Sequence, residues 1–306
     1  MIDFVGKRRW FFLISAILII IGIISLAVFG LKWGVDFSSG TAMTLQFEKE
    51  VELGQLRQQL ADLGYDTATI QPAGEKEFFI RVQEISSDQY AQLKEGLELG
   101  LASNITDSSV FTVSPIIAAA TVRNTAIAIV IASIGILLYI SWAFRKMPKP
   151  FRWGTCAILA LFHDLIIVIA IFSILGWAAG MEVDALFVTG VLAVAGVSVN
   201  NIVVVFDRIR ENSKRGVSSD LEVVANCGIM ESVGRSLNTG LATLFVIVAL
   251  YLLGGVTIRN LILALLVGIT TGIYSSLCIA GQLLVVWDKG EWGKLFSWLP
   301  SAKRPS

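Results

Sequence analysis

The sequence predicts a polytopic α-helical membrane protein with one α+β insert outside the membrane. Three observations lead to this prediction: the composition, six long apolar runs, and one stretch with a different periodicity. Of the 306 residues, 55% are hydrophobic and only 16% are charged, whereas a typical soluble domain has about 25% charged residues. This composition excludes a disordered chain, a nucleic-acid-binding protein and an ordinary soluble enzyme.

Six stretches are long enough to cross the hydrocarbon layer, which takes about 20 apolar residues in a helix. Five contain no Asp, Glu, Lys or Arg, and the third is interrupted only by Asp164. The six runs are 10–31, 124–144, 153–176, 185–206, 236–258 and 260–287. A cleaved signal peptide is the alternative for the first run, but the exit Phe29-Gly30-Leu31 lacks a small-x-small site, which favours an uncleaved anchor.

Basic residues predict the orientation through the positive-inside rule. They lie before the first run, between the second and third, after the fourth and after the sixth. We therefore expect a protein of the bacterial cell (inner) membrane with both termini in the cytoplasm. These residues are Lys7, Arg8, Arg9, Arg145, Lys146, Lys149, Arg152, Arg208, Arg210, Lys214, Arg215, Lys289, Lys294, Lys303 and Arg304. Segment 33–121 has 13 acidic and 5 basic side chains and is expected outside.

Residues 33–122 are predicted to form a ferredoxin-like domain with the order β-α-β-β-α-β. Period-two alternation predicts strands, and leucines three or four apart predict amphipathic helices. The expected strands are 43–47, 67–71, 78–82 and 111–113, and the expected helices are 53–63 and one carrying Leu93, Leu97 and Leu101. Asp88 is the expected cap of that second helix. The segment has no Cys, no His and no Gly-rich phosphate loop, so a binding or moving part is expected.

The chain is therefore expected to have four parts. They are 1–32 with the first spanning helix, the extracytoplasmic domain 33–122, helices two to six over 123–288 with a cytoplasmic connection at 207–235, and a cytoplasmic tail 289–306.

Asp164 is the acidic residue that the sequence puts inside the bilayer. It lies 12 residues after Arg152, which is about 18 Å along a helix and close to mid-membrane. A charge at that depth costs at least about 2.5–3.5 kcal/mol, so Asp164 should face the interior, be protonated or be paired. A functional role and a structural hydrogen bond are both open. His163 leaves the helix about 100° away, so the two are not expected to pair, and His163 is either a structural hydrogen-bonder or a proton carrier.

Other polar residues within the runs have two interpretations as well. Asn200 and Asn201 either hold helices together or form a polar station on an ion path. Arg235 is expected to open the fifth helix, either snorkelling to the interface or projecting inward if 221–234 lies in the interface. Small residues at every fourth position of the last run predict close helix packing, or a surface for a partner helix. They are Ala264, Gly268, Gly272, Ser276 and Ala280.

Enzymatic and cofactor-dependent functions lack the residues they need. One histidine and three cysteines make a multi-histidine metal site or a disulfide framework improbable, and neither a cofactor nor a metal is expected. Asp164 and Asp207 lie at different depths, which argues against an aspartyl dyad. Asp207, Arg208 and Arg210 are expected to form a solvated charge cluster where the fourth helix ends.

Several motifs resemble those of the SecF family. The segment Gly34-Val35-Asp36-Phe37-Ser38-Ser39-Gly40-Thr41 is similar to its GxDFxGGT element, and Phe162-His163-Asp164 to its LHD element. Gly196-Val197-Ser198-Val199-Asn200-Asn201 and the following stretch 203–212 resemble its GYSxND…VVFDRIREN signature. The resemblance covers nearly the whole chain.

The resemblance implies a fold, partners and a mode of action. A SecF protein is one six-helix half of an RND-type unit whose other half is SecD. The pair works beside the SecYEG channel and uses an ion gradient to help pull unfolded secreted chains across the membrane, after SecA has driven them in. Membrane lipid is the remaining expected contact, and no nucleic acid is expected.

Two departures from the family pattern stand out. Ser39 replaces a glycine, which is expected to change the backbone only slightly. Asn201 stands where the family has an Asp that is implicated in proton passage, and the proposed companion of that Asp matches Arg235. An amide does not titrate, so three explanations are open. The favoured one is that the coupling carboxylate lies in SecD; the others are that Asp164 substitutes for it, or that coupling is weak or uses another ion.

We therefore expect an ion path lined by Asp164, Asn200, Asn201 and Arg235, with His163 beside it, at an interface with SecD. The alternatives are a non-pumping scaffold that stabilises SecD or the channel, and half of an RND-type exporter.

Overall fold

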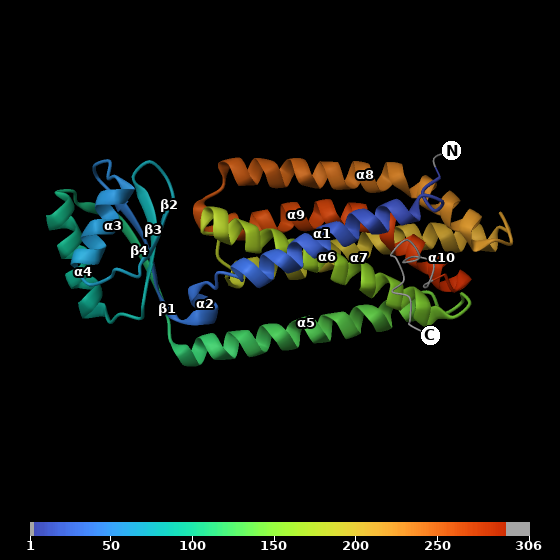
Figure 1. The fold of residues 1–306 in the computed structure, drawn as a ribbon, viewed down its shortest axis with the longest axis horizontal. Helices are drawn as coiled ribbons and strands as arrows, with labels where there is room; N and C mark the ends of the chain where they lie inside the picture. Colours follow the sequence, from blue (N-terminus) through green and yellow to red (C-terminus); the bar gives the residue numbers. More distant parts are fainter. Residues whose placement is uncertain (1–2, 292–306) are drawn as a thin grey trace, which may run out of the picture. The chain divides into compact units, whose positions relative to one another are not determined.

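The structure is a computed structural model that describes residues 3–291, and it divides into two compact units (Figure 1). The helical unit contains the chain up to Gly30, Ala128–Trp177 and the chain from Leu186 onward. The sheet unit contains Leu31–Ile127 and Ala178–Ala185. Most of the expected tail 289–306, with Lys294, Lys303 and Arg304, lies outside the described residues.

The sheet unit has four antiparallel strands in the order β2-β3-β1-β4, which is the ferredoxin-like arrangement. The strands are β1 (Gly40–Phe47), β2 (Thr69–Pro72), β3 (Glu77–Val82) and β4 (Ile105–Val113). Helices α3 (Leu53–Asp62) and α4 (Ser87–Leu101) cover one face of the sheet (Figure 1). The core between them consists of apolar residues at the predicted periodicities, among them Met43, Leu45, Phe47, Leu56, Leu60, Phe78, Ile80, Leu93 and Leu97.

Two details of this unit differ from expectation. Ser86, not Asp88, caps α4: its hydroxyl accepts a hydrogen bond from the Gln89 backbone, and the Gln89 side chain accepts one from the Ser86 backbone. This is a capping box, which satisfies two otherwise unpaired N–H groups. Strand β4 begins at Ile105, earlier than predicted, because it is an edge strand that buries only its two ends and therefore shows no alternation.

Six helices within residues 3–291 are long and apolar enough to cross a membrane. They are α1 (Arg8–Phe29), α5 (Pro115–Ala143), α6 (Pro150–Ala179), α7 (Ala185–Lys214), α8 (Leu221–Leu253) and the continuous run of α9 (Arg259–Ser275), the π-helix η2 (Ser276–Ala280) and α10 (Gly281–Lys289). Two short helices, α2 (Val35–Ser38) and η1 (Val256–Ile258), complete the set. Together with the small sheet, these helices confirm the predicted fold class.

Helices α7 and α8 extend well beyond the apolar runs. Helix α7 continues past Asp207 to Lys214, and α8 begins at Leu221, where the Asp220 carboxylate accepts a hydrogen bond from the Glu222 backbone. The expectation that Arg235 opens a helix is therefore wrong, since it lies 14 residues after the first residue of α8. Charged residues mark where a helix leaves the hydrocarbon, whereas a helix ends where its backbone is capped.

The small residues of α9 pack against α7 of the same chain. A Cβ atom on Gly268 would lie 2.3 Å from a methyl carbon of Val194, and one on Gly190 would lie 2.9 Å from the Ala264 methyl carbon. Gly272 lies opposite Ser198. Small residues at these positions let the two backbones approach closely.

Ser39 is the strained residue of the segment between α2 and β1. Its backbone has φ 61° and ψ 167°, a region that is essentially restricted to glycine. The side chain of Ser39 is therefore held on a backbone conformation that is unfavourable for residues other than glycine. Gly40 follows with φ 129°, and a Cβ there would lie 2.7 Å from the Val82 carbonyl oxygen.

We predict that Ser39→Gly stabilises the sheet unit by about 1 kcal/mol, because strain of about 1–3 kcal/mol is relieved against the greater chain entropy of glycine. Chemical unfolding of the full chain in mild detergent measures the change. Ser38→Gly is the matched control and should destabilise, since the Ser38 hydroxyl donates to the Gly34 carbonyl at 2.9 Å. Equal effects of the two substitutions would contradict the strain argument.

Candidate functional site

The buried carboxylate of Asp164 is the centre of the polar cluster in the helical unit. The side chain is 0% exposed, and α6 carries it into contact with two neighbouring helices. Its Oδ2 atom accepts hydrogen bonds from the Ser198 hydroxyl on α7 at 2.5 Å and from the Ser275 hydroxyl on α9 at 2.7 Å. Burial of a carboxylate is tolerable only when such donors replace water.

His163 contacts the other oxygen of Asp164, contrary to the expectation that the two side chains diverge. The distance from His163 Nδ1 to Asp164 Oδ1 is 3.1 Å. The 100° angle applies to the Cα–Cβ bonds, and it does not prevent the polar ends of two longer side chains from meeting. On its far side, His163 Nε2 lies 2.9 Å from the Ser15 hydroxyl of α1.

The contacts continue from Ser15 as a chain of hydrogen bonds. The Ser15 hydroxyl lies 3.2 Å from the Tyr274 hydroxyl of α9, and Tyr274 donates to the Phe11 carbonyl at 2.9 Å. The polar chain therefore joins α6, α1 and α9. Ser275, next to Tyr274, is the last residue before the π-helix η2, and π-helical turns are frequent at functional sites.

The donors and acceptors along this chain constrain where its protons lie. The Phe11 carbonyl only accepts, so the Tyr274 proton goes to it, the Tyr274 oxygen must accept from Ser15, and the Ser15 oxygen must accept from His163 Nε2. The remaining contact, between His163 and Asp164, needs one further proton on either partner. When every contact has its hydrogen bond, His163 and Asp164 together therefore carry one proton more than a neutral His163 and an ionised Asp164 would carry.

The other expected path residues lie apart from this cluster. Asn201 is buried on α7, whereas Asn200 and Arg235 are exposed in the single chain. Within residues 3–291, the hydrogen-bond partners of the Asp164 side chain are His163, Ser198 and Ser275, and the asparagines and Arg235 are not among them. The helical unit thus has an enclosed polar cluster around Asp164, and Asn200 and Arg235 are exposed outside it.

The charged residues after Asn201 form local pairs on α7. Arg210 pairs with Asp207, and Arg208 pairs with Glu211 at 2.8 Å. These are i,i+3 pairs at the helix surface, which contribute little to stability. Phe206 of the same stretch is buried against Phe144 and Trp153.

In the sheet unit, the motif residue Asp36 contacts the connector between α6 and α7, which we define as residues 180–185. Its carboxylate accepts a hydrogen bond from the Ala185 backbone at 2.9 Å, satisfying one free N–H group at the start of α7. Trp33 and Val183 form a parallel bridge, and Gln71 donates to the Gly180 carbonyl at 2.5 Å.

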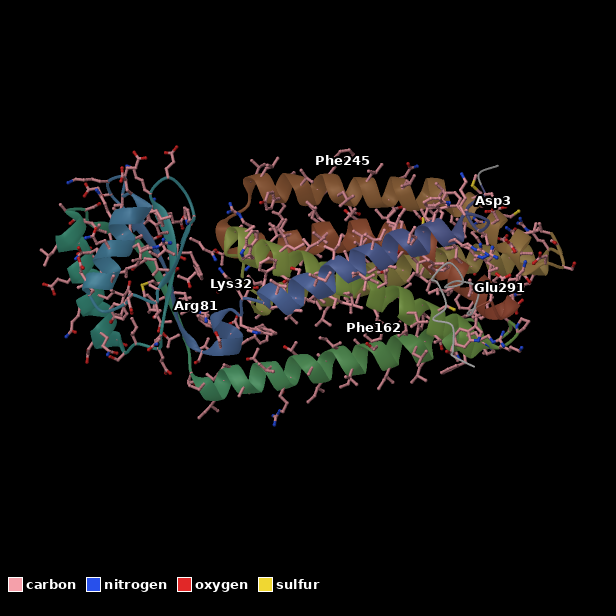
Figure 2. The ribbon with its side chains drawn as sticks, in the orientation of Figure 1. Asp3, Lys32, Arg81, Phe162, Phe245 and Glu291 are labelled. Carbon is pink, nitrogen blue, oxygen red and sulfur yellow. The ribbon has the colours of Figure 1, made fainter. Side chains whose placement is uncertain are left out.

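Glu182 is the buried acid of this connector. Arg81 projects from the sheet face opposite to α3 and α4 (Figure 2) and lies 3.2 Å from the Glu182 carboxylate. It also donates to the Trp33 carbonyl and to the Ser38 hydroxyl. Burial raises the pKa of Glu182, and the Arg81 charge only partly offsets that rise; Asp184 raises it further and Lys32 lowers it.

Several of these residues were not predicted from the sequence. Ser198 lies inside the motif at 196–201, and its position one helical turn from Asn201 could have marked it as a site residue. Ser15, Tyr274 and Ser275 gave no signal, because a hydroxyl in an apolar run most often bonds to its own helix.

We predict that Ser275→Ala lowers the free energy of unfolding by about 1–3 kcal/mol, because it leaves a buried acceptor on Asp164 with one partner fewer. Thermal unfolding of the full chain in mild detergent measures the loss. Ser276→Ala is the matched control, since that buried hydroxyl donates only to the Ile273 carbonyl of its own helix. A control loss as large as that of Ser275→Ala would refute the special role of the carboxylate.

We predict that Glu182 makes the sheet unit less stable as pH rises. A folded pKa above the ordinary value of 4.5 gives a stabilising contribution that is complete below that value and is lost as pH rises through the raised pKa. Glu182→Gln should therefore flatten the stability profile above pH 4.5, measured by urea unfolding. Glu84→Gln, at an exposed position just after β3, should keep the wild-type slope.

Comparison with known proteins identifies the family. Residues 24–51 match the family described as SecD/SecF GG Motif, and residues 94–290 match the family described as Protein export membrane protein SecD/SecF, C-terminal. The chain is 41% identical over 309 residues to protein translocase subunit SecF of Thermobaculum terrenum, with 97% of each chain covered. It is 38% identical over 299 residues to that of Anaerolinea thermophila, again with 97% of each covered.

A solved structure agrees with these matches. The crystal structure of SecDF, a translocon-associated membrane protein from Thermus thermophilus, superposes with a TM-score of 0.83 at 32% identity. The match covers 94% of this chain and 39% of the SecDF chain, so this chain corresponds to about two fifths of that protein. The chain belongs to the SecF family of protein translocase subunits.

Proposed function

We propose that this chain acts with a SecD partner beside the SecYEG channel, using the transmembrane ion gradient to promote the late stage of translocation of secreted proteins. In this proposal it is not an enzyme, both termini are cytoplasmic and the sheet unit lies outside the cell membrane. SecA delivers the unfolded chains on which the assembly acts. The observation that supports a coupled role is the continuous chain of polar contacts from Asp164 through His163, Ser15 and Tyr274 to the Phe11 carbonyl.

The proposed coupling proton resides on the pair of Asp164 and His163. With the proton bound, the pair has no net charge and every contact along the chain carries a hydrogen atom. Without it, a carboxylate remains in hydrocarbon surroundings and one contact toward α1 loses its hydrogen bond, which is unfavourable in a low-dielectric interior. Proton arrival and departure thus favour different arrangements of α1 against α6 and α9.

The energy available from the gradient is of the right size. One charge crossing 100 mV supplies about 2.3 kcal/mol, and a buried polar group left without a partner costs about 1–3 kcal/mol. A two-state bundle with states separated by a few kcal/mol responds to such a bias.

The connector is the proposed link between this chemistry and the sheet unit. It is continuous with α6, which carries Asp164, and with α7, which carries Ser198. Asp36 and Arg81 of the sheet unit hold it at Ala185 and Glu182. In this proposal, a shift of α6 against α7 alters the connector and is passed to the sheet unit.

A non-pumping scaffold is the second candidate, and one observation favours it. Asn201 carries an amide at the position where the related motif has a titratable Asp. The scaffold would stabilise SecD or the channel without using the gradient. Asn200 and Arg235, both exposed in the single chain, are available for a SecD contact in either case.

Reconstitution with its SecD and SecYEG tests the proposal through gradient-dependent completion of translocation. Asp164→Asn and His163→Asn should each abolish most of the gradient-dependent part while leaving co-purification with SecD intact. Ser276→Ala is the control and should retain the wild-type response. Stimulation that persists in both variants, or that never responds to collapse of the gradient, would favour the scaffold.

A further inference from the structure

A pocket of about 230 Å³ lies at one end of the helical unit. Segments distant in sequence meet there: the turn between α5 and α6, the first turn of α6, the stretch from the end of α7 to the start of α8, and α10. The lining residues are Met147, Pro148, Lys149, Arg152, Trp153, Ser213, Ser218, Ser219, Leu221, Val224, Leu284 and Asp288.

The pocket lies at the level where the spanning helices end. Helix α5 ends at Ala143, and α6 begins at Pro150. Trp142, 62% exposed, is stacked under the Arg145 guanidinium, whose carbon lies 4.4 Å from the ring centroid. Exposed Phe151 adds a second aromatic ring at this level. Aromatic and basic side chains in this combination are typical of the membrane–water interface, where lipid phosphates lie.

The pocket lining contains charged and polar side chains. Lys149 and Arg152 supply two positive charges, and Asp288, 3.6 Å from Arg152, supplies the negative charge. The lining therefore has one net positive charge, which matches a phosphodiester monoanion. Three serine hydroxyls in the lining are additional hydrogen-bond donors of the kind that binds phosphate oxygens.

The lining also contains apolar side chains. Trp153, Val224 and Leu284 are all buried side chains that contribute to it. A free phosphate ion would leave these side chains uncovered, whereas the glycerol and first acyl carbons of a lipid would cover them. The pocket is thus amphiphilic, with both charged and apolar side chains in its lining.

We propose that this pocket binds the headgroup phosphate of a monoanionic glycerophospholipid such as phosphatidylglycerol. Lys149 and Arg152 bind the phosphate, the serines donate hydrogen bonds, and the apolar side chains contact the glycerol backbone. A bound lipid would join the α5–α6 turn to α8 and α10 and so hold this end of the helical unit together. The site is independent of the cluster around Asp164.

Substitution of Lys149 can distinguish phosphate binding by this residue from a purely structural role. Its backbone has φ 51°, a left-handed conformation that is uncommon for residues other than glycine, and it precedes Pro150. Lys149→Gly is therefore expected to maintain or raise stability in the absence of lipid. If Lys149 binds phosphate, the same substitution must weaken lipid binding.

Native mass spectrometry of the full chain in mild detergent tests the site by titration with phosphatidylglycerol. Lys149→Gly and Lys149→Gln should weaken binding about tenfold, the loss expected for one hydrogen bond to a charged group. The unfolding temperature without lipid should not fall for Lys149→Gly. Lys214→Gln, an exposed lysine at the end of α7 outside the lining, should bind like the wild type.

Two further titrations distinguish the source of the phosphate. Phosphatidylcholine should bind more weakly than phosphatidylglycerol, and sn-glycerol 3-phosphate should not compete at matched concentration. Equal binding of the two lipids would overturn the selectivity for a monoanionic headgroup, and effective competition by glycerol phosphate would assign the pocket to a soluble ligand. Unchanged binding in both Lys149 variants would overturn the site.

Discussion

The carboxylate of Asp164 requires hydrogen-bond donors in a part of the chain that water does not reach. A single charge in hydrocarbon surroundings is costly. The hydroxyls of Ser198 and Ser275 donate to the carboxylate in place of water, and His163 Nδ1 lies 3.1 Å from its other oxygen. Ser198 lies on α7 and Ser275 on α9, so both helices must lie close to α6. The small residues Gly268 and Gly272 let α9 also lie close to α7, because larger side chains there would separate these two helices. Close helix packing is therefore needed for Asp164 to reach its hydrogen-bond partners.

The connector gives the two units a shared covalent element. It is short, and the sheet unit holds it by main-chain pairing at Val183, by the acceptor Asp36 and by the ion pair of Arg81 with Glu182. Such an arrangement fixes the first residue of α7 relative to the sheet. In the proposed coupling, a change in α6 or α7 would act on the sheet unit through the connector.

The fold could be predicted where one residue property repeats along the chain. Five long runs without charged residues, and one interrupted only by Asp164, predicted the six spanning helices, because the hydrocarbon layer imposes one length and one polarity on every span. The prediction failed at Arg235, since a helix continues past the membrane boundary when its backbone is not capped. The prediction of Asp88 as the cap of α4 was also wrong. Ser86 and Asp88 both carry side-chain acceptors near the start of this helix, and the backbone conformation decides which of them is the N-cap.

The amino-acid sequence alone determined the class of fold, the order of strands and helices in the insert, and the presence of one carboxylate, Asp164, within an otherwise uncharged apolar run. These follow from hydropathy and periodicity, which are local properties. The tertiary structure alone decided that His163 and Asp164 share a contact, that hydroxyls of α1, α7 and α9 complete it, and that Arg81 pairs with Glu182. The reason is that each of these contacts, apart from that of neighbouring His163 and Asp164, joins residues more than 30 positions apart, whose distance depends on how whole helices pack.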